Sequence, residues 1–183
     1  MTNNKSKISW IARTAVFIAL LIVMQAVTAA FGNTLVTGSV VNLMLILSVM
    51  TCGPLSGICV AVVSPVMAKL LGIGPLWSLI PVIIAGNTVL VLLWHFIGNR
   101  SAGKKYMRYL IALVTAAAAK FAVLYFGVVK IVLPILTELP ERQVSVISGM
   151  FSFPQLITAS IGGALAITIL PILRKAAVSA KLK

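Results

Sequence analysis

Residues 10–31, WIARTAVFIALLIVMQAVTAAF, form an apolar stretch that most strongly constrains the fold of this chain. The stretch has about the 20 residues that a helix needs to cross a hydrocarbon core about 30 Å thick. Only Arg13, Thr14 and Gln25 interrupt it. The sequence therefore predicts a first membrane span here.

Composition places the whole chain in the membrane. Its 183 residues are 61% hydrophobic and 9% charged, whereas a soluble domain is about 25% charged. The mean hydropathy is +1.14. We expect one membrane domain over residues 1–183, with short basic cytoplasmic tails at about 1–9 and 174–183, because no polar stretch is long enough for a second domain.

The apolar runs predict five further spans. The second run is short for a full crossing, and the spans lie at about 39–50, 55–71, 77–97, 109–133 and 144–173. Six spans place both termini and the basic loop 98–108 on one side, which the positive-inside rule identifies as the cytoplasm. The predicted fold is an all-α integral membrane protein with six transmembrane helices, multi-pass in the cell membrane, with both termini cytoplasmic.

The net charge of +13 does not indicate a nucleic-acid partner, because the basic residues lie at the ends of apolar runs. The loop 98–108 comes close to a phosphate-binding loop, G-x-x-x-x-G-K-[ST]. Lys105 replaces the hydroxyl residue of that motif, and the sequence contains no aspartate to hold magnesium. We therefore expect no nucleotide hydrolysis.

The sequence also lacks the residues that proton relays, metal sites and catalytic dyads require. The two acidic side chains, Glu138 and Glu141, fall in a predicted external loop, so no span carries the carboxylate that proton relays commonly use. His95 has no second histidine and no nearby acid, which disfavours a metal site or a catalytic dyad. We expect neither an enzyme nor a bound metal or cofactor.

Polar residues inside membrane spans are costly and are therefore candidates for function. Several fall between mid-membrane and the outer half, and two aromatic rings near them offer stacking surfaces. The predicted ligand-binding residues are Asn42, Lys69, Trp77, Asn87, Lys120, Tyr125 and Gln155. The alternative for the lysines is structural: Lys69 reaches to the interface, and Lys120 ties carbonyl groups inside the bundle.

The first span also has a face of small residues. Ala15 and Ala19 are four residues apart, with Ala12 a turn earlier, so another helix can approach this face closely. Small residues at this spacing serve either internal packing or contact with a partner, and the spacing alone leaves both open.

These features resemble the substrate-binding S components of energy-coupling factor (ECF) transporters. The similarity lies in the chain length, the six spans with a short second one, the Ala15-x-x-x-Ala19 motif, the absence of an ATPase motif, and the closing run FSFPQLITASIGGALA at 151–166. The resemblance implies a subunit that captures a vitamin or similar small molecule from outside. It also implies partners, namely a transmembrane coupling subunit that Ala15 and Ala19 would face, and two cytoplasmic ATPases.

A second hypothesis is a self-sufficient small transporter or channel that works as a homo-oligomer. Its contacts between copies would use the small-residue faces Gly53/Gly57/Ala61 or Ala159/Gly163. The substrate also stays open. Two intramembrane lysines without acids favour an anionic or carbonyl-rich molecule, and pantothenate-like, flavin-like and pyridine- or purine-like compounds all fit.

Overall fold

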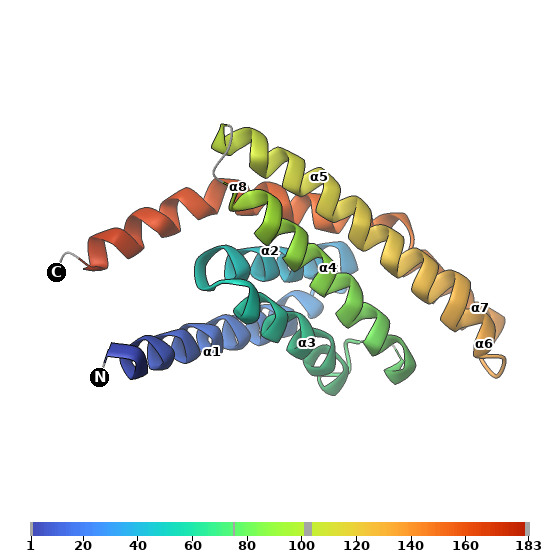
Figure 1. The fold of residues 1–183 in the computed structure, drawn as a ribbon. Coiled ribbons are helices and arrows are strands. Elements are labelled where there is room, and N and C mark those ends of the chain that lie inside the picture. Colours follow the sequence, from blue (N-terminus) through green and yellow to red (C-terminus); the bar gives the residue numbers. More distant parts are fainter. Residues whose placement is uncertain (1, 75, 101–103, 182–183) are drawn as a thin grey trace.

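The computed structural model describes residues 2–74, 76–100 and 104–181, and within these ranges the chain is helical with no strand. The elements are α1 Thr2–Ala29, α2 Thr34–Cys52, α3 Pro54–Leu70, the 3-10 turn η1 Trp77–Leu79, α4 Ile80–Gly98, α5 Lys105–Leu124, the π-helical segment η2 Tyr125–Val132, α6 Leu133–Ile135, α7 Glu141–Met150 and α8 Phe153–Lys181. Both ends of the chain lie at the same end of the bundle (Figure 1).

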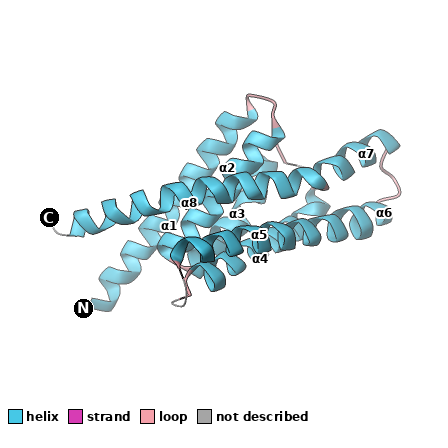
Figure 2. Cartoon of the chain, turned by 90° about the horizontal axis from the view of Figure 1, so that it is seen from above, coloured by secondary structure: helices cyan, strands magenta, loops and turns pink. Residues whose placement is uncertain are grey.

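The helices match a membrane bundle. Five stretches are long and apolar enough to cross a membrane, and a sixth helix, α3, is apolar but shorter. The central helix is α2, which packs against α1, α3, α4 and α8 (Figure 1). Seen from above, α5 and α8 run together toward α6 and α7, at the end away from the two termini (Figure 2).

The second helix is longer than the sequence predicts. It has 19 residues, so the prediction of a short second span is wrong, and α3, with 17 residues, is the shorter helix. The cause is Asn33, whose side-chain Oδ1 accepts a hydrogen bond from the Leu35 N–H and caps the helix start. Helix α2 therefore begins at Thr34, five residues before the predicted start of this span at residue 39.

Helix α5 also exceeds its predicted span. It begins at Lys105, within the predicted basic loop, and continues through η2 and α6 to Ile135. Pro134, predicted to open a loop, lies inside α6. The 31 residues of this stretch extend roughly 46 Å at the α-helical rise, well beyond a hydrocarbon core of about 30 Å. Residues 101–103 of the predicted loop lie outside the described part of the chain.

The predicted sixth span, 144–173, is two helices. A turn at Phe151 and Ser152 separates α7 from α8. Pro154 falls in the first turn of α8, where its missing N–H leaves no helical hydrogen bond unmade, so a helix starts readily there. The predicted tails are also largely helical, because α1 begins at Thr2 and α8 continues to Lys181.

The small-residue faces outside α1 pack inside the protein. A Cβ added at Gly57 would meet Val91 and Val49 side-chain atoms at 2.6 and 2.8 Å, and one at Gly163 would meet Leu113 at 3.1 Å. Ala61 and Ala159 are buried. Gly57, Ala61, Ala159 and Gly163 are therefore already used between helices of one copy, whereas no atom lies within 4 Å of a Cβ added at Gly53. The homo-oligomer hypothesis loses most of the surface on which it rested.

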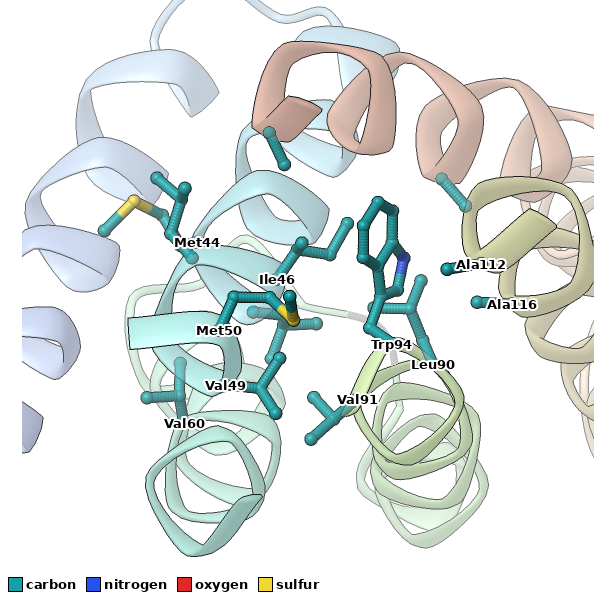
Figure 3. Close-up of a cluster of buried hydrophobic side chains, with 14 of the residues drawn as sticks. Met44, Ile46, Val49, Met50, Val60, Leu90, Val91, Trp94, Ala112 and Ala116 are labelled. Atoms are coloured by element: carbon teal, nitrogen blue, oxygen red, sulfur yellow. The ribbon is translucent and has the colours of Figure 1, made fainter. Parts of the chain in front are cut away.

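The apolar core has two clusters. The first, the Trp94 cluster, is centred on Leu45, Leu90, Trp94, Ala112 and Ala116. In Figure 3 the Trp94 ring lies beside Leu90 and faces the two alanines of α5. The second, the Leu124 cluster, lies toward α6 and α7 and comprises Leu79, Leu124, Val128, Leu133, Ile147 and Phe151.

Candidate ligand-binding cavity

A cavity of about 270 Å³ opens at the end of the bundle away from the chain termini. Its wall takes residues from the C-terminal end of α1, the start of α2, the C-terminal half of α3, α4, α5 and the junction between α7 and α8. Leu124 and Phe151 of the Leu124 cluster contribute part of this wall. Ten of the 24 lining residues are polar or charged, and the others are apolar residues and glycines.

Lys120 is the charged residue in that wall. It is 3% exposed, and its Nζ donates to Asn42 Oδ1 at 2.6 Å and to Asn87 Oδ1 at 2.7 Å. Asn42 comes from α2 and Asn87 from α4. The amide oxygens at the ammonium group offset part of the unfavourable free energy of burying its charge.

The two amides are held in one orientation. Asn42 Nδ2 donates to Thr158 Oγ1 at 3.3 Å, and Asn87 Nδ2 lies 3.5 Å from the Ala61 carbonyl oxygen. An ammonium only donates and a backbone carbonyl only accepts, so each amide turns its oxygen toward Lys120. This network links α5 to α2 and α4 directly, and to α8 and α3 through the amides.

The charge of Lys120 is not neutralised by an acid. The two carboxylate side chains of the sequence, Glu138 and Glu141, are both exposed, outside the cavity wall. An ammonium group has three protons to donate, and in the described part of the chain Nζ makes two hydrogen bonds. In its ammonium form, Lys120 therefore has one N–H beyond the two that the amide oxygens accept.

Gln25 and Ser64 form a second polar group of the cavity wall, and the sequence did not single them out as ligand residues. Gln25 Nε2 donates to Ser64 Oγ at 3.2 Å and lies 3.4 Å from the Ser64 carbonyl oxygen. Thr158, which holds Asn42, was also missed. The sequence did contain a signal for this second polar group. Gln25 is an amide within a predicted membrane span, and such a residue needs hydrogen-bond partners.

Four of the seven predicted ligand residues line the cavity: Asn42, Asn87, Lys120 and Gln155. Gln155 is half-buried, and its Nε2 donates to the Met150 carbonyl oxygen at 3.0 Å. Three of the four, Asn42, Asn87 and Lys120, meet in one hydrogen-bonded network.

The other three, Lys69, Trp77 and Tyr125, lie outside the cavity wall. Trp77 belongs to η1 and is 56% exposed. Lys69 follows Ala68, and Tyr125 follows Leu124, each directly after a wall residue. One residue along a helix turns a side chain by about 100°, which carries both away from the cavity. Tyr125 instead stacks on Phe121 at 5.7 Å between ring centroids.

The first helix leaves its alanine face uncovered. Ala15 and Ala19 are exposed, whereas Thr14, Leu21 and Gln25 are buried against the bundle. The face is therefore not used for internal packing within the described chain.

No metal-binding cluster of three or more His, Cys, Asp or Glu residues occurs among the described residues. His95 Nδ1 pairs with Asn99 Nδ2 at 3.1 Å. Gly103, which completes the near match to a phosphate-binding loop, lies outside the described residues.

Fold and cavity together define a class of protein: a multi-pass helical membrane protein with a polar-lined cavity inside its bundle. The chain belongs to the family of ECF transporter substrate-specific components, whose family model matches residues 10–174. Members of this family are substrate-binding subunits of transporters and not enzymes, so the resemblance inferred from the sequence is confirmed. No curated protein and no solved structure matches the chain.

Proposed function

We propose that this protein captures a vitamin-like small molecule from outside the cell in the cavity beside Lys120. A transmembrane coupling subunit and two cytoplasmic ATPases then deliver the molecule inward. The observation that carries this proposal is a buried ammonium group, uncompensated by any acid, at the wall of a 270 Å³ cavity.

The distribution of charge supports an outward-facing cavity. The cavity lies at the end of the bundle away from the two termini and from the junction between α4 and α5. Those other segments hold most of the basic residues, including Arg100, Lys104, Lys105 and Arg108. By the positive-inside rule they belong in the cytoplasm, which leaves the cavity on the outer side.

The residues proposed to contact the ligand are Asn42, Asn87, Lys120 and Gln155. Lys120 favours a carboxylate or another oxygen acceptor, because a charge-assisted hydrogen bond is about twice as strong as a neutral one. The apolar remainder of the wall favours a carbon skeleton at the other end of the molecule. The proposed site does not include Lys69, Trp77 or Tyr125.

We place the contact with the coupling subunit at Ala15 and Ala19. Their exposure on α1 and their spacing of four residues give a smooth surface on which a second helix can pack closely. The face is separate from the cavity wall, to which α1 contributes Gln25 and Ala29.

The test is co-purification of the protein with the coupling subunit and the ATPase pair, for the parent and for Ala15→Trp and Ala19→Trp. We expect either tryptophan to abolish complex formation and uptake, while the isolated variant keeps its melting temperature. Leu20→Trp is the matched control, because Leu20 is 48% exposed and lies about 100° around the helix from Ala19. It should still form the complex.

Two results would contradict the proposal. Complexes that survive both alanine substitutions would remove the docking assignment. A parent protein that never associates with ATPases, yet transports by itself in vesicles, would remove the role as a subunit.

A further inference from the structure

Two asparagines, Asn42 and Asn87, set the charge around Lys120. Their Oδ1 atoms lie 2.6 and 2.7 Å from Lys120 Nζ, and their side chains are 1% and 2% exposed. Aspartate has the same shape as asparagine, with an oxygen in place of the amide nitrogen. A carboxylate at either position would therefore form an ion pair with Lys120, and the chain has a neutral amide at both.

No acidic side chain neutralises this lysine. The sequence has two of them, Glu138 and Glu141, and both are exposed and outside the cavity wall. Among the lining residues, all of them in the described part of the chain, Lys120 is the one with an ionisable side chain. With Lys120 in its ammonium form, the wall thus holds one positive charge and no negative charge.

The charge of Lys120 acts on a molecule in the cavity whether or not the two touch. Charges interact more strongly in the low dielectric of a protein interior than in water, and salt screens them less there. The ammonium group therefore attracts a carboxylate and repels a protonated amine. Such an amine would also leave water without finding a carboxylate in the wall, which is costly in free energy.

We infer that the ligand is an acid without a protonated amine, and that Asn42 and Asn87 determine this charge selectivity by being amides. This inference rests on the proposed function and names the substrate class. Carboxylic acids without an amino group belong to the class. Amines, quaternary ammonium compounds and zwitterionic amino acids do not. Both asparagines act through Lys120, which they hold without neutralising it.

The hydrogen bonds around Asn42 permit the substitution that tests this inference. Asn42 Nδ2 donates to Thr158 Oγ1 at 3.3 Å, and the Thr158 hydroxyl donates to the Gln155 carbonyl oxygen at 3.2 Å. In Asn42→Asp, this hydroxyl can turn and donate to the new carboxylate. The other carboxylate oxygen accepts from Lys120 Nζ, as the amide oxygen does in the parent.

The experiment incubates the purified full-length protein with the dialysable fraction of yeast extract and identifies the retained compounds by mass spectrometry. The affinities of the retained acid and of its uncharged primary amide are then measured for the parent, Asn42→Asp and Asn99→Asp. Asn99→Asp is the matched control, because Asn99 is exposed at the C-terminal end of α4 and outside the cavity wall. Melting temperatures without ligand show that each variant folds.

We expect the compound retained by the parent to be an acid without a protonated amine, and to bind more tightly than its amide. Asn42→Asp should bind the acid at least about tenfold more weakly, which is the difference between a charge-assisted and a neutral hydrogen bond. Its affinity for the amide should change much less, because the amide has no charge for the new carboxylate to repel. Asn99→Asp should bind both compounds like the parent.

Asn87→Asp replaces Asn42→Asp if the latter does not fold. It places a carboxylate at the second oxygen that contacts Lys120 Nζ, and it gives up only the 3.5 Å contact of Asn87 Nδ2 with the Ala61 carbonyl oxygen. The same loss of discrimination between acid and amide is expected. The parent alone provides a further check, because equal affinity for the acid and its amide would overturn the inference.

The outcomes separate this inference from the proposed function. A parent protein that retains a cation, a zwitterion or a neutral compound overturns the inference and leaves a substrate-binding cavity in place. If the folded Asn42→Asp variant binds the acid like the parent, or loses acid and amide equally, the asparagines do not set the charge selectivity and the inference is wrong. A parent protein that retains nothing overturns the binding cavity, and the inference with it.

Discussion

The Trp94 cluster and the Lys120 network are built on the same three helices, yet they are opposite in character. On α5, Ala112, Ala116 and Lys120 follow at four-residue spacing and are all buried. The first two leave room for the Trp94 ring, whereas the third ends at two amides and a cavity. One helix face thus changes from close apolar packing to an open polar site within a single turn.

This difference shows how a membrane bundle keeps its stability and still holds a polar site. The Trp94 cluster packs closely in the half that contains both termini, and the Leu124 cluster adds a second region of close packing in the other half. The half with the Leu124 cluster also holds the buried Lys120 with its two amides, at an energetic cost that the Trp94 cluster does not have. Substitutions in the two halves should therefore affect stability and binding differently.

The largest loss of stability is expected from Trp94→Ala. Trp94 is 1% exposed in the Trp94 cluster and does not line the cavity. Removing a buried indole ring should lower the free energy of unfolding by about 3 to 5 kcal/mol. Trp77→Ala, at a ring that is 56% exposed, is the control and should change little. Melting temperatures in detergent test both variants. If Trp94→Ala melted at the same temperature as the parent, the Trp94 cluster would not be the stabilising region that the comparison assumes.

A smaller loss, of about 2 kcal/mol, is expected from Lys120→Met. The change removes a buried charge but leaves Asn42 Oδ1 and Asn87 Oδ1 without a donor, and each unpaired acceptor costs about 1 to 3 kcal/mol. Binding of the compound retained from yeast extract should also be lost. Lys130→Met, at an exposed lysine, should leave binding unchanged and lower stability by less than about 1 kcal/mol, because it removes only the contact with the Tyr125 ring.

A triple variant sharpens this prediction. Lys120→Met combined with Asn42→Leu and Asn87→Leu removes donor and acceptors together, and the stability should recover toward that of the parent while binding stays lost. If Lys120→Met alone melts at or above the parent temperature, the amides do not depend on the lysine and the network is not structural.

The boundary between the two regions is tested by Gly162→Ala, with an expected loss of roughly 1 to 2 kcal/mol. A Cβ at Gly162 would lie 2.7 Å from the Ser39 carbonyl oxygen and 2.8 Å from the Leu43 nitrogen, so α8 and α2 must move apart. Gly149→Ala is the control, because no atom lies within 4 Å of the added carbon. Unfolding in denaturant compares the two, and equal stability would show that α8 shifts freely.

The smallest effect is expected from Tyr125→Leu. It removes the stacking on Phe121 and the contact of Lys130 Nζ with the Tyr125 ring, 5.5 Å from its centroid. The two interactions are together worth about 1 kcal/mol at this half-buried residue. Retention of the compound from yeast extract should be unchanged, and a clear loss of retention would place Tyr125 in the binding site.

Prediction from the sequence succeeded for features that depend on a single property of the residues, such as the hydrophobicity of a run. The lengths of the apolar runs predicted the helical bundle, and the high cost of placing Lys120, Asn42 and Asn87 in a membrane predicted that they have a special role. Their meeting in one network needs the packing of α2, α4 and α5, which no single stretch encodes. The sequence equally left open whether Lys120 ties the helices or binds a ligand, and the geometry accommodates both.

The misplaced boundaries have local causes that the sequence does contain. Asn33 before Thr34 is an N-cap signal that outweighed the turn-rich appearance of its surroundings. Pro154 in the first turn of α8 similarly marks the start of a new helix. Lys69 and Tyr125 lie outside the cavity wall for another reason: the sequence gives depth along a helix, but not how the helix is rotated about its axis.

The position of Lys120 in the chain bears on how the protein is made. A lysine at the centre of an isolated membrane helix disfavours insertion by about 2.5 to 3.5 kcal/mol. Asn42 and Asn87 precede Lys120 in the sequence, so α2 and α4 leave the ribosome before α5 does. When α5 emerges, both amide oxygens are already in the bilayer to receive its ammonium group. The order of synthesis therefore supplies the partners of this lysine before the lysine itself arrives.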